Sequence, residues 1–328
     1  MSSAAPPLLR VDGLSVDIAV PAGTLHAVTD AGFDVRPGET LCVVGESGCG
    51  KTMTSLALMR LLPRAARIAA GRVAFEGRDL LDLLDAEMAD LRGNRLAMIF
   101  QDPMTSLNPV FTIGAQLEEV YRRHRAAGAR EARERAEYLL QRIGIMSPGL
   151  RLRQFPHQLS GGLRQRMMIA MALMCSPSLI IADEPTTALD VTVQVQILRL
   201  LAELQREFGM ALILITHNLG VVARIADKVA VMYGGRIVEA GQAADIFRRP
   251  AHPYTQALLD CVPAPGRSKA DGRLGSIPGR VPSLIGEVRG CMFRNRCTYA
   301  RSTCAADDIP LRADARGHTA RCVLEAVP

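Results

Sequence analysis

The sequence predicts an α/β protein with a mainly parallel sheet covered by helices. Short apolar runs alternate with helical patterns between residues 40 and 216, and such alternation is typical of parallel sheets. A mostly helical stretch interrupts the alternation at about 91–177, and prolines and glycines crowd the chain beyond residue 249. We therefore expect one domain at 1–250, with a helical subdomain at about 91–177, and a C-terminal extension at 251–328.

Composition fits an ordinary globular protein, because 48% of the 328 residues are hydrophobic and 22% are charged. The net charge of +6 is modest and spread along the chain, so we expect no nucleic-acid partner. No run approaches the roughly 18 consecutive apolar residues of a membrane-spanning helix, and the first ten residues lack a signal-peptide pattern. The sequence therefore predicts a cytoplasmic protein that would attach to a membrane only through partners.

The first expected elements lead to a glycine-rich turn. Leu8–Val20 and the short apolar run Thr40–Val44 are expected as strands. A helix is expected from Lys51 to about Leu62, ended by Pro63. Another strand is expected at Gly71–Phe75.

The turn after Thr40–Val44 has the pattern G-x-x-x-x-G-K-[ST], which is typical of a phosphate-binding loop. Glycines let successive N–H groups point at phosphate oxygens, and the helix that follows adds partial positive charge. Lys51 is expected to reach the β- and γ-phosphates, and the Thr52 hydroxyl to bind Mg²⁺. All eight loop residues are expected to bind ATP: Gly45, Glu46, Ser47, Gly48, Cys49, Gly50, Lys51 and Thr52.

Two carboxylates follow a second apolar strand, expected at Leu179–Ala182. Asp183 and Glu184 stand at its carboxyl end, where ligands of parallel sheets bind. Asp183 suits the coordination sphere of Mg²⁺. Glu184 is placed to accept a proton from the attacking water, or to orient it.

A second anion-binding position is indicated by Leu159-Ser160-Gly161-Gly162, which precedes an apolar helix. Serine at a helix start, followed by two glycines, exposes backbone N–H groups. By themselves these residues fit a plain capped helix equally well.

The phosphate loop, LSGG at 159–162 and DEPTTALD at 183–190 together resemble the ATP-binding subunit of an ABC transporter. The resemblance covers nearly the whole chain. It implies the P-loop NTPase fold of ABC ATPases and an ATP hydrolase activity. It also implies that Ser160, Gly161 and Gly162 contact the γ-phosphate of ATP bound to a partner subunit.

The same resemblance implies roles for three further positions. Gln101 belongs to the loop that contacts ATP and Mg²⁺ and senses the membrane partner. Ala188-Leu189-Asp190 links two ATP sites across a dimer, with Asp190 near the partner's ATP. His217, after an expected strand at Ala211–Thr216, contacts the γ-phosphate and acts in catalysis with Glu184.

The chain departs from the family pattern at three places. Leu163 follows LSGG where many relatives carry glutamine, and Asn218 follows His217 where aspartate is common. The region that should stack an aromatic residue on adenine is Gly23–His26, and it offers only His26. The sequence therefore leaves the adenine contact open.

Two segments are similar to those of dipeptide, oligopeptide and nickel importers: FQDPMTSLNP at 100–109 and HPYTQAL at 252–258. The resemblance implies an ATPase that powers import of di- or oligopeptides, peripheral to the cytoplasmic face of the inner membrane. It implies a second related ATPase subunit in a heterodimer, two integral membrane permease subunits and an extracytoplasmic solute-binding protein. A nickel or other small-solute importer, or a soluble ABC ATPase not tied to transport, is the alternative.

Four of the eight cysteines crowd the last part of the chain with the spacing C-x5-C-x6-C-x17-C: Cys291, Cys297, Cys304 and Cys322. Four thiolates suit Zn²⁺ or an iron–sulfur cluster, and a metal supplies folding energy where a core is small. The spacing lacks the tight pairs of structural zinc sites. The resemblance to peptide-importer ATPases favours a [4Fe–4S] cluster, with zinc as the lesser alternative.

Overall fold

A computed structural model describes residues 6–187, 189–262, 276–286, 289–305, 309–325 and 327. Ala188, in the expected loop Ala188–Asp190, lies outside the described residues. The chain divides into two compact units. The loop unit contains Met1–Arg36, Thr40–Leu81 and Thr216–Pro328, and the helical unit contains Pro37–Glu39 and Asp82–Ile215.

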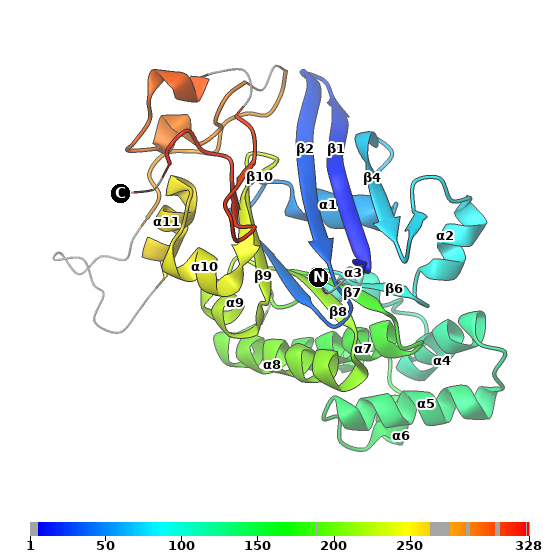
Figure 1. Cartoon of the computed structure of the whole chain (residues 1–328). Helices are drawn as coiled ribbons and strands as arrows, with labels where there is room; N and C mark the ends of the chain where they lie inside the picture. Colours follow the sequence, from blue (N-terminus) through cyan, green and yellow to red (C-terminus); the bar gives the residue numbers. More distant parts are fainter. Residues whose placement is uncertain are drawn as a thin grey trace. The chain divides into compact units, whose positions relative to one another are not determined.

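One sheet of the loop unit is antiparallel, with strand order β2-β1-β4-β5. Its strands are β1 (Leu9–Val20), β2 (Gly23–Val35), β4 (Ala66–Phe75) and β5 (Arg78–Asp79). Figure 1 shows β1 between β2 and β4. The strand expected at Gly71–Phe75 begins five residues earlier, because Ala66–Ala70 also pairs with β1.

The remaining strands of the loop unit form a mixed arrangement. They are β3 (Thr40–Val44), β9 (Lys228–Tyr233), β10 (Arg236–Gln242), β11 (Arg312–Ala313) and β12 (Thr319–Ala320). β3 pairs with β9 in parallel, and β9 with β10 antiparallel. Because β12 pairs with β10 and β11 with β12, the C-terminal part of the chain adds strands to this unit.

The helices of the loop unit are α1 (Lys51–Leu58), α9 (Leu219–Ile225), α10 (Ala243–Arg248), α11 (Pro253–Asp260) and the 3-10 turns η2 (Arg294–Arg296) and η3 (Ser302–Ala305). α1 ends four residues before the expected Leu62. Its end is set by Arg60, whose φ of 51° is left-handed, so Pro63 is not what stops the helix.

The strands of the helical unit are β6 (Leu96–Ile99), β7 (Leu179–Asp183) and β8 (Ala211–Ile215). β7 pairs in parallel with both β6 and β8. Every residue of β7 and β8 is buried, as expected for parallel strands covered on both faces.

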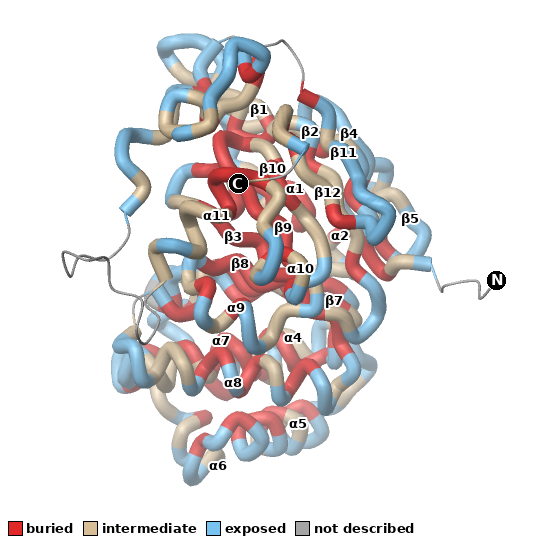
Figure 2. Tube along the Cα trace, turned by 60° about the vertical axis from the view of Figure 1, so that its left-hand side comes forward, coloured by how far each residue is buried: buried red, intermediate tan, exposed pale blue. Residues whose placement is uncertain are grey.

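The helices of this unit are α2 (Asp85–Leu91), α3 (Pro103–Ser106), α4 (Ile113–His124), α5 (Ala129–Arg142), α6 (Pro148–Arg151), η1 (Pro156–Gln158), α7 (Gly161–Leu173) and α8 (Val191–Phe208). α8 buries one side, as the red segments among paler ones along it show (Figure 2). α5 is charged on its outer face, where Arg130 and Glu134 pair one turn apart.

Within the described residues, none of the helices combines the length and the hydropathy required to span a bilayer. Beyond residue 250, the described chain contributes side chains to the core of the loop unit. Tyr254, Leu284, Phe293 and Ile309 are all buried. The expected boundary between 250 and 251 stays a prediction.

Candidate functional site

The phosphate loop, Gly45–Thr52, connects β3 to α1 and requires glycine at two positions. The φ angles of Gly45 and Gly50 are 154° and 103°. A Cβ at Gly45 would lie 2.1 Å from Met232 O, and one at Gly50 2.4 Å from Ala27 O. Because both neighbours are backbone atoms, a side chain at either glycine would force the main chain apart. The sequence pattern therefore reflects the packing of this loop.

The side chain of Lys51 lies inside the phosphate loop and bonds to its backbone. Its side chain is buried, and Nζ donates to Gly45 O at 2.9 Å and to Glu46 O at 3.0 Å. Cys49 Sγ lies 3.7 Å from the same ammonium. Thr52 is exposed in the first turn of α1, and that turn (KTMT) contains no carboxylate. The loop thus offers a cation, a hydroxyl and a helix N-terminus, which fit the phosphates of a nucleotide.

Glu46 has partners that no local sequence pattern indicates. Its carboxylate accepts two bonds from Arg296, at 2.6 and 3.0 Å, and its N–H donates to Tyr254 Oη at 2.9 Å. The side chain of Glu46 is therefore directed to the C-terminal part of the chain. Ser47 and Gly48, the next two residues, are exposed.

His217 lies beside the strand that leads into the phosphate loop. The N–H of Thr216, the preceding residue, donates to Val43 O at 3.2 Å. His217 itself is exposed. Asn218 caps α9, because its Oδ1 accepts the N–H of Val221 at 3.3 Å. The unusual Asn218 thus has a structural role of its own.

The region expected to meet adenine is bordered by the C-terminal part of the chain. His26 Nδ1 lies 2.8 Å from Asp17 Oδ1, so its ring is held against β1. The N–H of His26 donates to Leu284 O at 2.9 Å, and Leu25 forms a β-bridge with Ile285. Ile285 is exposed. The segment around Ile285 therefore borders the region where sequence reasoning found no aromatic residue.

In the helical unit, Asp183 and Glu184 stand at the carboxyl end of β7. Asp183 is 2% exposed, whereas Glu184 has left the strand with a φ of 43°. Its N–H still donates to Ile215 O at 3.0 Å, and Thr187 Oγ1 donates to Glu184 Oε2 at 2.8 Å. A positive φ is costly for glutamate, and such strain gathers at functional sites.

Ser160 caps α7 as the pattern predicts. Its Oγ accepts the N–H of Leu163 at 3.4 Å. Gly161 and Gly162 form the first turn of the helix, so their N–H groups lie at its positive end. The glycines are also packed: a Cβ at Gly162 would lie 3.3 Å from Val193 Cγ1. Leu163 occupies the third helical position and supplies the capped N–H.

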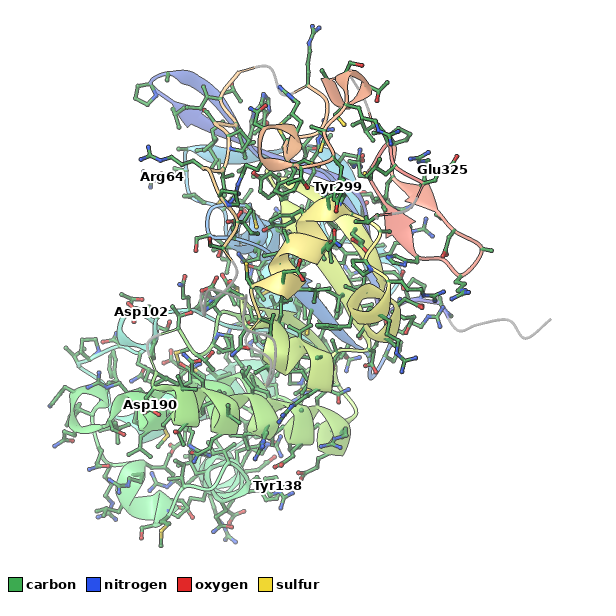
Figure 3. All side chains as sticks on the ribbon, turned by 90° about the vertical axis from the view of Figure 1, so that its left-hand side faces the viewer. Arg64, Asp102, Tyr138, Asp190, Tyr299 and Glu325 are labelled. Carbon is green, nitrogen blue, oxygen red and sulfur yellow. The ribbon has the colours of Figure 1, made fainter. Side chains whose placement is uncertain are left out.

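The loop before α8 lies against these glycines, because a Cβ at Gly161 would lie 3.5 Å from Leu189 Cδ2. Asp190 caps α8, with Oδ1 accepting the N–H of Val193 at 3.0 Å. Figure 3 labels Asp190 at the start of this helix. The structure therefore brings together the two segments that the resemblance assigned to the partner's ATP.

Gln101 is exposed between β6 and α3. Asp102, labelled in Figure 3, follows it and leads into α3. Exposed apolar side chains accompany Gln101 in the same unit: Phe100, Val110 and Phe111. The predicted site residues thus divide between the loop unit and the helical unit.

The prediction of a metal centre at the four clustered cysteines is wrong. Among the residues that the structure describes, no group of three or more His, Cys, Asp or Glu side chains could hold a metal ion. The thiols instead line a cavity of about 10 Å³, room for about one water: Cys291, Cys297, Cys304 and Cys322. Burial raises the pKa of the Cys291 thiol to about 11, so it is neutral at pH 7. The cavity is also lined by Phe293 and Ile309, which suit neutral thiols.

Two protein families match this chain. The family described as ABC transporter matches residues 28–187. The family described as oligopeptide/dipeptide transporter, C-terminal region, matches residues 238–304. The second match includes Tyr254 and Arg296, the partners of Glu46.

Similar proteins cover nearly the whole chain. A probable peptide ABC transporter ATP-binding protein of Sinorhizobium fredii is 49% identical over 96% of this chain and 94% of its own. The dipeptide transport ATP-binding protein of Escherichia coli is 48% identical over 96% of each chain. A dimeric ATP-binding cassette in a post-hydrolysis state with ADP and Pi has a TM-score of 0.65 and 25% identity, covering 72% of this chain and 98% of its own. None of these names refers to an iron–sulfur cluster.

Proposed function

The chain belongs to the family of ABC transporter ATP-binding proteins, and from this premise we propose that it hydrolyses ATP to power the import of dipeptides or oligopeptides. The observation that carries ATP binding is the phosphate loop, in which two glycines exclude any side chain and Lys51 is held inside. The match to the oligopeptide/dipeptide C-terminal region supports peptides over nickel or another solute.

We assign nucleotide binding in the loop unit to Gly45–Thr52. The ammonium of Lys51 would exchange its two carbonyl partners for β- and γ-phosphate oxygens. His217 follows Thr216, whose N–H donates to Val43 O in β3, and would contact the γ-phosphate. Carboxylate, hydroxyl and amide oxygens suit Mg²⁺, so Thr52, Asp183 and Gln101 would hold the ion. The bound ion would neutralise negative charge on the phosphates.

Glu184 is the proposed general base. Its carboxylate accepts a bond from Thr187 Oγ1 at 2.8 Å, which orients it at the carboxyl end of β7. Removing a proton from that water as it attacks the γ-phosphate is the step that glutamine at this position could not perform.

Ser160, Gly161, Gly162 and Asp190 are proposed to act on the ATP of a partner subunit. A capped helix start with two glycines presents N–H groups to an anion, and α7 of the helical unit begins in this way. A heterodimer with a related ATPase would complete both sites. We therefore expect the isolated chain to hydrolyse ATP slowly.

The membrane partners would be two permease subunits, which receive peptide from an extracytoplasmic binding protein. Phe100, Val110 and Phe111 are exposed apolar side chains near Gln101 in the chain, and they suit the docking of a short helix. Such docking would hold the protein on the cytoplasmic face of the inner membrane.

The test is reconstitution of this chain with its permeases, second ATPase and binding protein in proteoliposomes. We expect peptide-loaded binding protein to stimulate ATP hydrolysis and peptide uptake. Glu184→Gln should retain ATP binding and lower hydrolysis by at least ~10²-fold, and the exposed Glu203→Gln on α8 is the matched control. Uptake of nickel without peptide, or unchanged hydrolysis in Glu184→Gln, would refute the assignment.

A further inference from the structure

Arg296 is a buried cation that connects the C-terminal part of the chain to the phosphate loop. Its side chain is 4% exposed, and both of its terminal nitrogens donate to the carboxylate of Glu46. Its remaining bonds go to Pro278 O at 2.8 Å, Ile277 O at 3.0 Å and Tyr233 Oη at 3.2 Å. A guanidinium with this many fixed partners cannot change its position without breaking several bonds together.

An aromatic cluster packs around this ion pair. The ring centroids of Tyr233 and Tyr254 are 4.5 Å apart, and Phe293 lies 5.3 Å from each. The guanidinium of Arg296 stands over the rings of Tyr233 and Phe293, at 5.7 and 5.9 Å. The rings cover the guanidinium of Arg296, and its low exposure to water strengthens its attraction to Glu46.

Tyr254 makes the second contact with the loop and is itself fixed. It is fully buried near the start of α11, and its N–H donates to His252 Nδ1 at 3.0 Å. Glu239, which is also fully buried, accepts the N–H groups of Ala251 and His252 at 2.7 and 2.9 Å. The hydroxyl that accepts the Glu46 N–H is thus held by the sheet of the loop unit.

We propose that Arg296 and Tyr254 are positioning residues of the phosphate loop, which hold Glu46 so that the loop has its ATP-binding conformation before ATP arrives. The inference rests on the assignment of Gly45–Thr52 as the ATP-binding loop. It gives the C-terminal extension a part in nucleotide binding that does not depend on its cysteines.

The physical reason is the conformational freedom of a glycine-rich segment. Gly45, Gly48 and Gly50 all have positive φ, and glycine loses more entropy than other residues when it is fixed. A loop fixed beforehand leaves less of this entropy to be lost when ATP binds. Loss of the contacts should therefore weaken ATP binding, whereas turnover of bound ATP should be kept.

The test uses the full chain and a cycle of substitutions. Arg296→Met and Glu46→Gln are each expected to raise the Kd for ATP by about tenfold, measured by calorimetry, because each removes a charged pair. The double variant should bind no more weakly than either single one. Tyr254→Phe should raise the Kd about threefold. In the reconstituted transporter, the KM for ATP should rise in the same proportion and kcat should stay within about twofold.

Arg294→Met is the matched control. Arg294 lies in the same turn, η2, but donates to the carbonyls of Arg289 and Cys291 and not to the loop. It should leave the Kd for ATP unchanged. Arg296→Lys keeps the charge without the two-pronged geometry and should recover part of the affinity.

The possible outcomes distinguish a failure of the positioning role from a failure of the proposed ATPase function. If the unmodified chain and Lys51→Ala both fail to bind ATP, the function is wrong. If the unmodified chain binds ATP and Lys51→Ala does not, an unchanged Kd in Arg296→Met overturns the positioning role alone. Additive effects of the two substitutions, or an equal effect of Arg294→Met, would also overturn it. Should Arg296→Met fail to fold, Glu46→Gln decides by itself.

Discussion

The glycines of the phosphate loop and the C-terminal segment at 289–305 are constrained by different kinds of contact. Backbone atoms lie so close to Gly45 and Gly50 that neither position leaves room for a Cβ, although side chains hold the loop at Glu46. The segment is held by side chains, in which Phe293 packs on two tyrosines and Arg296 satisfies its donors. Where close backbone contacts determine the conformation, only glycine fits, so a sequence motif predicts the structure. Where side-chain contacts determine it, the spacing of residues along the chain does not predict which side chains will pair.

The largest expected effect concerns the backbone-held region. Gly50→Ala should abolish measurable ATP binding, a loss of at least ~100-fold, because its Cβ would collide with Ala27 O and its φ is 103°. The matched control is Gly77→Ala, since Gly77 also has a positive φ, of 80°, but meets nothing within 4 Å. Calorimetric titration with ATP compares the two. Equal affinities would show that steric exclusion does not define the loop.

The next effect concerns the side-chain-held region. Phe293→Ala should lower the free energy of unfolding by about 3–5 kcal/mol, since a buried aromatic ring leaves a cavity between Tyr233 and Tyr254. Phe111→Ala, at an exposed ring, should change it by less than about 0.5 kcal/mol. Urea unfolding followed by circular dichroism measures both. If Phe293→Ala were as stable as the unmodified chain, the packing of Phe293 would not be what holds the segment at 289–305.

Several features of the molecule follow from local sequence. The run Leu179–Ala182 is confirmed as a buried strand, because a short continuous apolar run suits a parallel strand that is covered on both faces. The loop Gly45–Thr52 connects a strand, β3, to a helix, α1, as expected. The pattern predicts this because its glycines are required by the close backbone contacts of the loop. The ABC ATPase fold is confirmed by the matched family and by the solved cassette.

Other features depend on contacts that no local pattern encodes. Glu46 and Arg296 are 250 residues apart in sequence, and nothing near either one indicates the pair. The end of α1 is set by the left-handed Arg60, a residue with no helix-stopping signal. Cysteine spacing predicted a metal, but spacing fixes neither the direction of a thiol nor its charge. Burial keeps the pKa of Cys291 high, and no group of three or more possible ligands among the described residues is arranged to hold a metal ion.

A smaller effect should appear with pH. Burial lowers the pKa of His252 to about 4, whereas the unfolded chain protonates it near 6.5. The unfolded state therefore binds more protons between these values, and stability should fall as the pH falls from 6.5 to 4, by about 3 kcal/mol. His252→Asn, which keeps a capping acceptor for Tyr254 N–H, should flatten this dependence. An unchanged pH profile of urea unfolding would contradict the expected neutral His252.

His318 provides the control of opposite sign. Its hydrogen bond with Glu239 raises the pKa of His318, so the folded state keeps its proton longer than the unfolded one. That stabilisation should be complete below about pH 6.5 and should be lost as the pH rises through the raised value. His318→Gln should therefore lower stability most at acidic pH.

The measurement that tests most directly whether the C-terminal segment belongs to the nucleotide site is hydrogen exchange of the full chain with and without ATP. We expect ATP to slow exchange at Gly45–Thr52 and also at 289–305, because Arg296 joins the two. In Lys51→Ala, both changes should disappear at the same ATP concentration. Slower exchange confined to Gly45–Thr52, with 289–305 unaffected by ATP, would contradict the coupling.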